Sequence, residues 1–145
     1  MKTLITLIAA ALFTSLSSFA FSAAKPEPVK FVHVESIIDQ YIEAMTKGET
    51  EYLNSLFTHD FKLTTPSNTN SKPVTQNEII KYLKTLQDVK LLCETDYSFV
   101  EKNNDCSIVK VTSSFDNFER IDYLTVCNSE LGWKISNVVV AYPEK

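Results

Sequence analysis

The sequence predicts an α+β fold in which helices come first and an antiparallel sheet follows. Apolar side chains recur at helical spacing between Val34 and Met45. From residue 90 onward, four segments are rich in β-branched and aromatic residues, and short polar turns separate them. Helices followed by a run of strands are typical of α+β proteins rather than of alternating βαβ units. A length of 145 residues favours one domain.

The first 24 residues have the pattern of a secretory signal peptide. Lys2 is basic, an apolar run extends over 4–16, and small residues follow. The apolar run is short for a membrane span, although an uncleaved anchor is the alternative interpretation. We therefore expect an exported protein, in the periplasm or outside the cell, with no membrane attachment after cleavage. Residues 25–32 are expected to be an extended tether, and residues 33–145 the folded domain.

The helical and loop signals can be assigned along the first half of the domain. Gly48 stands where a helix C-cap is expected, and Thr50 can cap a second, shorter helix that carries Leu53, Leu56 and Phe57. A short strand is expected over 61–65, and the polar segment 66–73 is a loop by composition. Thr75 and Glu78 form a predicted capping box for a third helix.

Strands are predicted at 90–101, 105–115, 118–127 and 132–141. Two-residue turns at 103–104 and 116–117 would fix their register. The second turn puts Cys106 opposite Cys127, which predicts a disulfide after export and leaves Cys93 free. The first turn puts Asp96 on the same face as Val111 and Asp122.

This register gives the sheet two apolar faces, both unsuited to water. The face expected to meet the helices carries Asp96 and Asp122 among Leu92, Val100, Val109, Val111, Leu124 and Val126. The opposite face carries Tyr97, Phe99, Ile108, Ile121 and Tyr123. Because the helices can cover one face alone, we expect a homodimer through the face bearing Tyr97, Phe99, Ile108 and Tyr123.

Composition excludes several classes of site. The two glycines, Gly48 and Gly132, cannot build a phosphate-binding loop, which needs several close together. The two histidines lie far apart and no CxxC pair occurs, so neither a metal site nor a cofactor is expected. A formal net charge of −4 without a run of basic residues argues against nucleic-acid binding.

Three stretches carry a resemblance to a known family. They are Tyr41-Ile42-Glu43-Ala44 through Gly48, then Leu56-Phe57-Thr58-His59-Asp60-Phe61-Lys62-Leu63, and Asp122-Tyr123-Leu124-Thr125-Val126 followed by Gly132-Trp133-Lys134-Ile135. With the element order, they resemble the nuclear-transport-factor-2-like superfamily, and within it the bacterial putative lumazine-binding branch. The resemblance implies a conical fold, in which three N-terminal helices pack on a curved, mostly antiparallel sheet around a cavity.

Ketosteroid isomerases share this fold, and the resemblance carries parts of their site over. Their oxyanion tyrosine matches Tyr41, and their protonated oxyanion aspartate matches Asp122. Their catalytic base matches Thr65, which cannot take a proton from a carbon acid near neutral pH. Tyr41 and Asp122 are therefore either two donors aimed at a ligand carbonyl or core residues, with Asp122 paired to a backbone amide or to Arg120.

These arguments favour non-catalytic binding of a small, largely apolar or carbonyl-bearing molecule, or of a partner segment, in a central cavity. The cavity candidates are Tyr41, Asp122, Asp96, Val109, Val111 and Leu124. One alternative is an acid–base isomerase or lyase, of the ketosteroid-isomerase or polyketide-cyclase type, that uses Asp122 and Asp96 with Tyr41. A second alternative is an interaction module whose cavity is filled by its own side chains.

Overall fold

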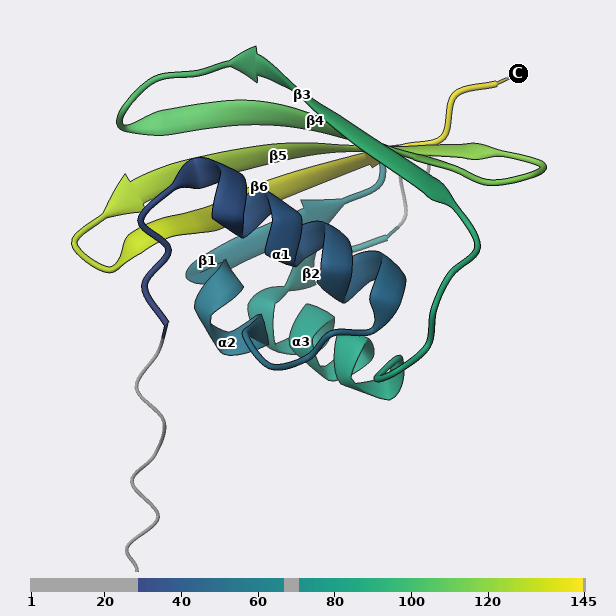
Figure 1. Cartoon of the computed structure of the whole chain (residues 1–145), viewed down its shortest axis with the longest axis horizontal. Helices are drawn as coiled ribbons and strands as arrows, with labels where there is room; N and C mark the ends of the chain where they lie inside the picture. The colour runs from purple at the N-terminus through teal and green to yellow at the C-terminus, as the bar shows by residue number, and fades with distance from the viewer. Residues whose placement is uncertain (1–28, 67–70, 145) are drawn as a thin grey trace, which may run out of the picture.

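A computed structural model describes residues 29–66 and 71–144, which form three helices and a twisted sheet (Figure 1). The predicted signal peptide and residues 25–28 of the predicted tether lie outside these residues. The elements in chain order are α1 (Val34–Lys47), α2 (Leu53–Leu56), β1 (Phe57–Thr64), β2 (Val74–Thr75), α3 (Gln76–Thr85), β3 (Glu94–Glu101), β4 (Cys106–Ser114), β5 (Glu119–Ser129) and β6 (Gly132–Ala141). The α+β prediction is confirmed.

All three helices lie on one face of a six-stranded sheet, and the other face carries no helix of the described chain (Figure 1). The strand order is β2-β1-β6-β5-β4-β3. Neighbouring strands are antiparallel except β1 and β6, which run parallel. β6, the last of the described strands, is therefore an inner strand that bonds to β1 on one side and to β5 on the other.

Local sequence signals set the ends of α1 and α3. Gly48 caps α1 in the left-handed region at φ 67°, and an added Cβ there would clash with the carbonyl oxygen of Leu86. Thr75 and Glu78 form the predicted capping box at the start of α3. Each helix buries one apolar stripe, and the α1 stripe includes Ile37 and Ile38, both fully buried.

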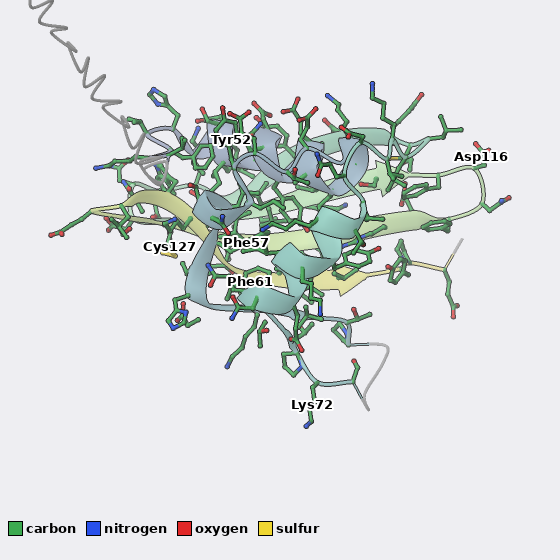
Figure 2. The ribbon with its side chains drawn as sticks, turned by 90° about the horizontal axis from the view of Figure 1, so that it is seen from below. Tyr52, Phe57, Phe61, Lys72, Asp116 and Cys127 are labelled. Carbon is green, nitrogen blue, oxygen red and sulfur yellow. A yellow bond between two sulfur atoms is a disulfide. The ribbon has the colours of Figure 1, made fainter. Side chains whose placement is uncertain are left out.

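Two details of the first half differ from the prediction. The second helix begins at Leu53 with Tyr52 at its N-cap, so Thr50 does not cap it. Phe57 is the first residue of β1, which starts four positions earlier than expected and runs to Thr64. Phe57 and Phe61 both point into the core from this strand and pack against each other at 4.5 Å between ring centroids (Figure 2). The strand therefore begins earlier than the alternation of apolar and polar residues over 61–65 indicated, and Phe57 packs in the core from its first position.

The predicted register of β4 and β5 is confirmed. Cys106 lies opposite Cys127, and the two are joined by a disulfide with a Cα–Cα distance of 4.0 Å. Val111 pairs with Asp122, also as predicted. Cys93 is the free cysteine and is half-buried.

The predicted register of β3 is wrong by one residue. Tyr97, rather than Asp96, pairs with Val111, and a bulge lies between Phe99 and Glu101. Because side chains alternate between the faces of a strand, this shift exchanges the two faces of β3. Tyr97 and Phe99 pack against the core, whereas Asp96 and Val100 are exposed. The outer face therefore keeps Ile108 and Tyr123 from the expected dimer surface but not Tyr97 or Phe99.

Candidate functional site

A chain of three polar side chains leads from the interior of the protein to a pocket. The hydroxyl of Tyr41 on α1 donates to Oδ2 of Asp122 on β5 at 2.8 Å. Oδ1 of Asp122 accepts a hydrogen bond from Nε of Arg120 at 2.8 Å. Arg120 and Asp122 are two residues apart on one strand, so they share its inner face. Both carboxylate oxygens thus have a donor, one from a helix and one from the sheet.

Burial determines the protonation of Tyr41 in this group of three side chains. Tyr41 and Asp122 are only 1% and 3% exposed, respectively. Burial, followed by the charge of Asp122, raises the pKa of Tyr41 well above its usual value, so its hydroxyl stays protonated and donates. Burial alone would lower the pKa of Arg120, but its surroundings, which include the Asp122 carboxylate, raise that pKa. The arrangement is a neutral tyrosine hydrogen-bonded to the buried carboxylate of an ion pair whose arginine is partly exposed.

Of these three side chains, Arg120 is the one that lines the pocket. The pocket has a volume of about 400 Å³ and lies at the end of β1, against α3 and the end of β6. Its walls are mostly apolar or aromatic: Met45, Leu63, Val74, Ile79, Tyr82, Val140 and Tyr142. Thr65, Glu78 and Arg120 supply its polar groups. One guanidinium in an apolar wall can orient a small molecule through hydrogen bonds.

The guanidinium of Arg120 has more N–H groups than the one bonded to Asp122. A guanidinium has five N–H donors. Among the described residues, Nε of Arg120 donates to Asp122, and the guanidinium also interacts with the Tyr41 hydroxyl. The Asp122 carboxylate fixes the guanidinium, and Tyr41 fixes the carboxylate from behind. The site therefore presents preoriented donors rather than a flexible cation.

The predicted site residues do not form one cavity in the structure. Tyr41 and Asp122 lie together as expected, but Arg120 lies between them and the pocket. Of the two predicted alternatives, the structure therefore has the one in which Asp122 pairs with Arg120. Val109, Val111 and Leu124 are buried in the packed core and line none of the pockets described here.

Asp96 and Asp122 do not meet, because the one-residue shift of β3 places them on opposite faces of the sheet. Asp96 pairs with Thr112 and is exposed, whereas Asp122 is buried. Thr65, at the position of the isomerase base, does line the Arg120 pocket. The pocket therefore does not contain the predicted pair of carboxylates, Asp96 and Asp122. Glu78 is the acidic residue among the lining residues described, and it already accepts hydrogen bonds from Thr75.

Sequence reasoning did not identify the walls of this pocket. Met45 comes from α1, Tyr82 from α3 and Tyr142 from the segment after β6, and nothing in their local patterns links them. The Arg-x-Asp spacing at 120–122 was the available signal, because strand alternation puts both side chains on one face. No cluster of three or more metal-ligating side chains occurs within residues 29–66 and 71–144. No helix of that part of the chain is both long and apolar enough to cross a membrane.

The fold and this pocket define a protein of the conical nuclear-transport-factor-2-like class. A solved structure of a nuclear-transport-factor-2-like protein of unknown function from Silicibacter pomeroyi has a TM-score of 0.63 and 19% sequence identity, covering 75% of this chain and 92% of that one. Within that class, the chain belongs to the family described as Putative lumazine-binding, whose sequence pattern matches residues 30–140.

Other solved structures share the fold at low sequence identity. A cystatin-like fold protein from Burkholderia xenovorans has a TM-score of 0.62 and 17% identity, covering 77% of this chain and 90% of that one. A nuclear-transport-factor-2-like protein of unknown function from Pseudomonas aeruginosa has a TM-score of 0.56 and 12% identity, covering 76% and 98%. No curated protein matches the chain. These likenesses concern the fold, and the function must be argued from the site.

Proposed function

We propose that this protein is an exported, non-catalytic binder of a small, largely apolar molecule that carries a carbonyl group. The observation that carries the proposal is the position of Arg120, whose side chain is held by buried Asp122 and lines an otherwise mostly apolar pocket. The pocket volume of about 400 Å³ lies in the range of small-molecule sites. Arg120, rather than Tyr41 or Asp122, would meet the ligand.

Charge balance favours a neutral carbonyl over an acid as the ligand. The positive charge of Arg120 is matched by Asp122 at 2.8 Å, and Glu78 adds a negative charge at the pocket wall. The pocket therefore has donors to offer but no net positive charge to attract an anion. A carbonyl oxygen accepts such donors without bringing a charge of its own, and an apolar body suits Leu63, Val74 and Val140.

The proposal of binding without catalysis rests on Thr65. A proton transfer at carbon needs a base with a pKa near the working pH, and a threonine hydroxyl has none. Glu78 is the carboxylate at the pocket, but it caps α3 through the backbone N–H and the hydroxyl of Thr75. If Glu78 served as a base instead, the protein would be an acid–base isomerase or lyase, which Glu78→Gln would inactivate.

Native mass spectrometry of the purified protein tests the proposal. We expect a bound species of low mass on the wild type and on the Lys62→Met control, whose exposed lysine lies outside the pocket wall. The species should be lost or weakened roughly 5- to 30-fold in Arg120→Met, as expected for one hydrogen-bonding group of about 1–2 kcal/mol. A protein that binds nothing would support the interaction-module alternative. Turnover of screened carbonyl compounds would support the enzyme.

Export and self-association are further parts of the proposal. We infer export from the leader pattern at 1–24, and the intact mass of the secreted protein should show a start between Phe21 and Lys25. We infer a homodimer from the face of the sheet that the helices leave open, where Ile108 and Tyr123 are 41% and 38% exposed. A full-length mass in a membrane fraction would contradict export.

A further inference from the structure

A second and larger pocket lies at the opposite end of β1. Its volume is about 670 Å³, and its wall includes Phe57, which begins β1, whereas the Arg120 pocket contains Leu63 and Thr65 from the other end. Lys30 and Lys134 also line it, from the N-terminal segment and from β6. The two pockets share no lining residue, so they are separate sites.

Lys134 is the distinctive group in this pocket. Its Nζ donates to the backbone carbonyl of Ser55 at 2.8 Å, which holds the ammonium at the pocket wall. Burial lowers the pKa of Lys134, and no neighbouring carboxylate counters that effect. Among the described residues, no carboxylate lies within ion-pair distance of it. A half-buried charge without a counter-ion is costly, and a bound anion would reduce that cost.

The rest of the wall adds a second cation and an apolar surface. Lys30 also lines this pocket, and Glu130 is the acidic residue among the lining residues described. Phe57 and Leu131 supply apolar area, and Leu131 is 67% exposed. Unlike the Arg120 pocket, where Asp122 matches the cation, this pocket has an excess of positive charge beside an apolar wall. That combination suits an anion with an apolar body.

We propose that this pocket is a second binding site, for a small organic anion whose charged group pairs with Lys134 and whose apolar body contacts Phe57 and Leu131. The proposal does not depend on what binds at Arg120. It assigns opposite preferences to the two ends of β1, with a neutral carbonyl compound at one end and an anion at the other.

An NMR titration of the ¹⁵N-labelled protein with 2-naphthoate tests the proposal, with 2-naphthamide as the matched neutral probe. We expect 2-naphthoate to shift the amide signals of residues 54–59 and 129–134, and 2-naphthamide to shift them at least tenfold more weakly. Lys134→Met should weaken 2-naphthoate binding at least tenfold, while Lys134→Arg and Lys62→Met keep it. Shifts confined to residues around Arg120, equal binding of both probes, or no binding of 2-naphthoate would overturn the proposal.

A second measurement keeps the test decisive if Lys134→Met does not fold. In the wild type, 2-naphthoate should raise the pKa of the Lys134 ammonium, followed through its side-chain NMR signal, because a bound anion stabilises the charged form. Binding should also weaken as the pH rises through that pKa. The other ionisable groups at this pocket are Lys30, His59 and Glu130. An unchanged lysine titration in the presence of saturating 2-naphthoate would overturn the proposal.

Discussion

Tyr41 on α1 donates its hydroxyl to Asp122 on β5 at 2.8 Å, across 81 positions of sequence. This bond joins the longest helix to an inner strand of the sheet at a point where both side chains are buried. Arg120 completes the arrangement from the same strand. The bond therefore does two things at once: it connects the helical layer to the sheet, and it orients the group that reaches the pocket.

Removing the Tyr41 hydroxyl should destabilise the protein. Tyr41→Phe leaves Oδ2 of buried Asp122 without its donor, and we expect a loss of about 1–3 kcal/mol in the free energy of unfolding. Urea denaturation of the variant measures this loss. The control is Tyr123→Phe, on the exposed face, which should change the free energy by less than about 0.5 kcal/mol. Equal effects of the two changes would contradict the structural role assigned to the bond.

Breaking the Arg120–Asp122 pair from one side should cost more than removing both partners. Arg120→Met leaves the Asp122 carboxylate buried without a counter-ion, and we expect a loss of about 3 kcal/mol. The double variant Arg120→Met/Asp122→Leu removes that unpaired charge, so it should be more stable than Arg120→Met. Thermal and urea unfolding of both variants decide this. A double variant at or below the stability of the single one would show that the pair is not electrostatically coupled.

The Cys106–Cys127 disulfide should contribute about 3 kcal/mol to stability, because it closes a loop with a sequence separation of 21 residues. We expect Cys106→Ala/Cys127→Ala to lower the urea midpoint accordingly. A reducing agent should destabilise the wild type by a similar amount and leave the double variant unchanged. Cys93→Ala, which removes the free thiol, is the control. Peptide mapping that found Cys93 in a disulfide would contradict the register of β4 and β5.

Glu78 should make the stability of α3 depend on pH in the acid range. Its hydrogen bonds to the backbone and hydroxyl of Thr75 lower its pKa in the folded state. The stabilising contribution is therefore complete above the unfolded-state pKa of about 4.3 and is lost as the pH falls through the lower folded-state pKa. We expect the Tm difference between wild type and Glu78→Gln to shrink from pH 7 to about pH 3. Glu94→Gln, an exposed change on β3, should not reproduce this trend.

The outer face of the sheet should mediate self-association. Tyr123→Glu places a charge on the outer face, opposite Lys110 and diagonal to exposed Ile108, and we expect it to shift a wild-type dimer toward monomer in sedimentation velocity. Tyr142→Glu, at an exposed site after β6, should leave the dimer intact. A wild-type protein that sediments as a monomer at tens of micromolar would remove the proposed dimer. Phe99 is unsuitable for this test, because its ring packs against the core.

The sequence was sufficient for features that depend on neighbours along the chain. The α1 stripe, the Gly48 cap and the Thr75–Glu78 box are local, and each appears in the structure as predicted. The β4–β5 register was also predictable, because its turn leads directly from one strand into the next, with Cys106 and Cys127 brought opposite each other. Short loops fix register through their own geometry.

The β3 register was not predictable in the same way, because a bulge between Phe99 and Glu101 inserts one residue that leaves no mark in the apolar pattern. The same difficulty affects the site. Met45, Tyr82 and Tyr142 form one pocket wall only because α1, α3 and the end of β6 meet in space. Their identities suit a pocket, but their sequence positions give no sign that they share one.

The position of β6 has a consequence for how the protein is made. β6, the last of the described strands to be synthesised, lies inside the sheet, and β1 is connected to β5 only through it. Until residues 132–141 have been synthesised, the early strand has no parallel partner, and Ile135, Val138 and Val140 are missing from the core. Until that point the nascent chain therefore lacks both the strand that links β1 to the rest of the sheet and three side chains of the core.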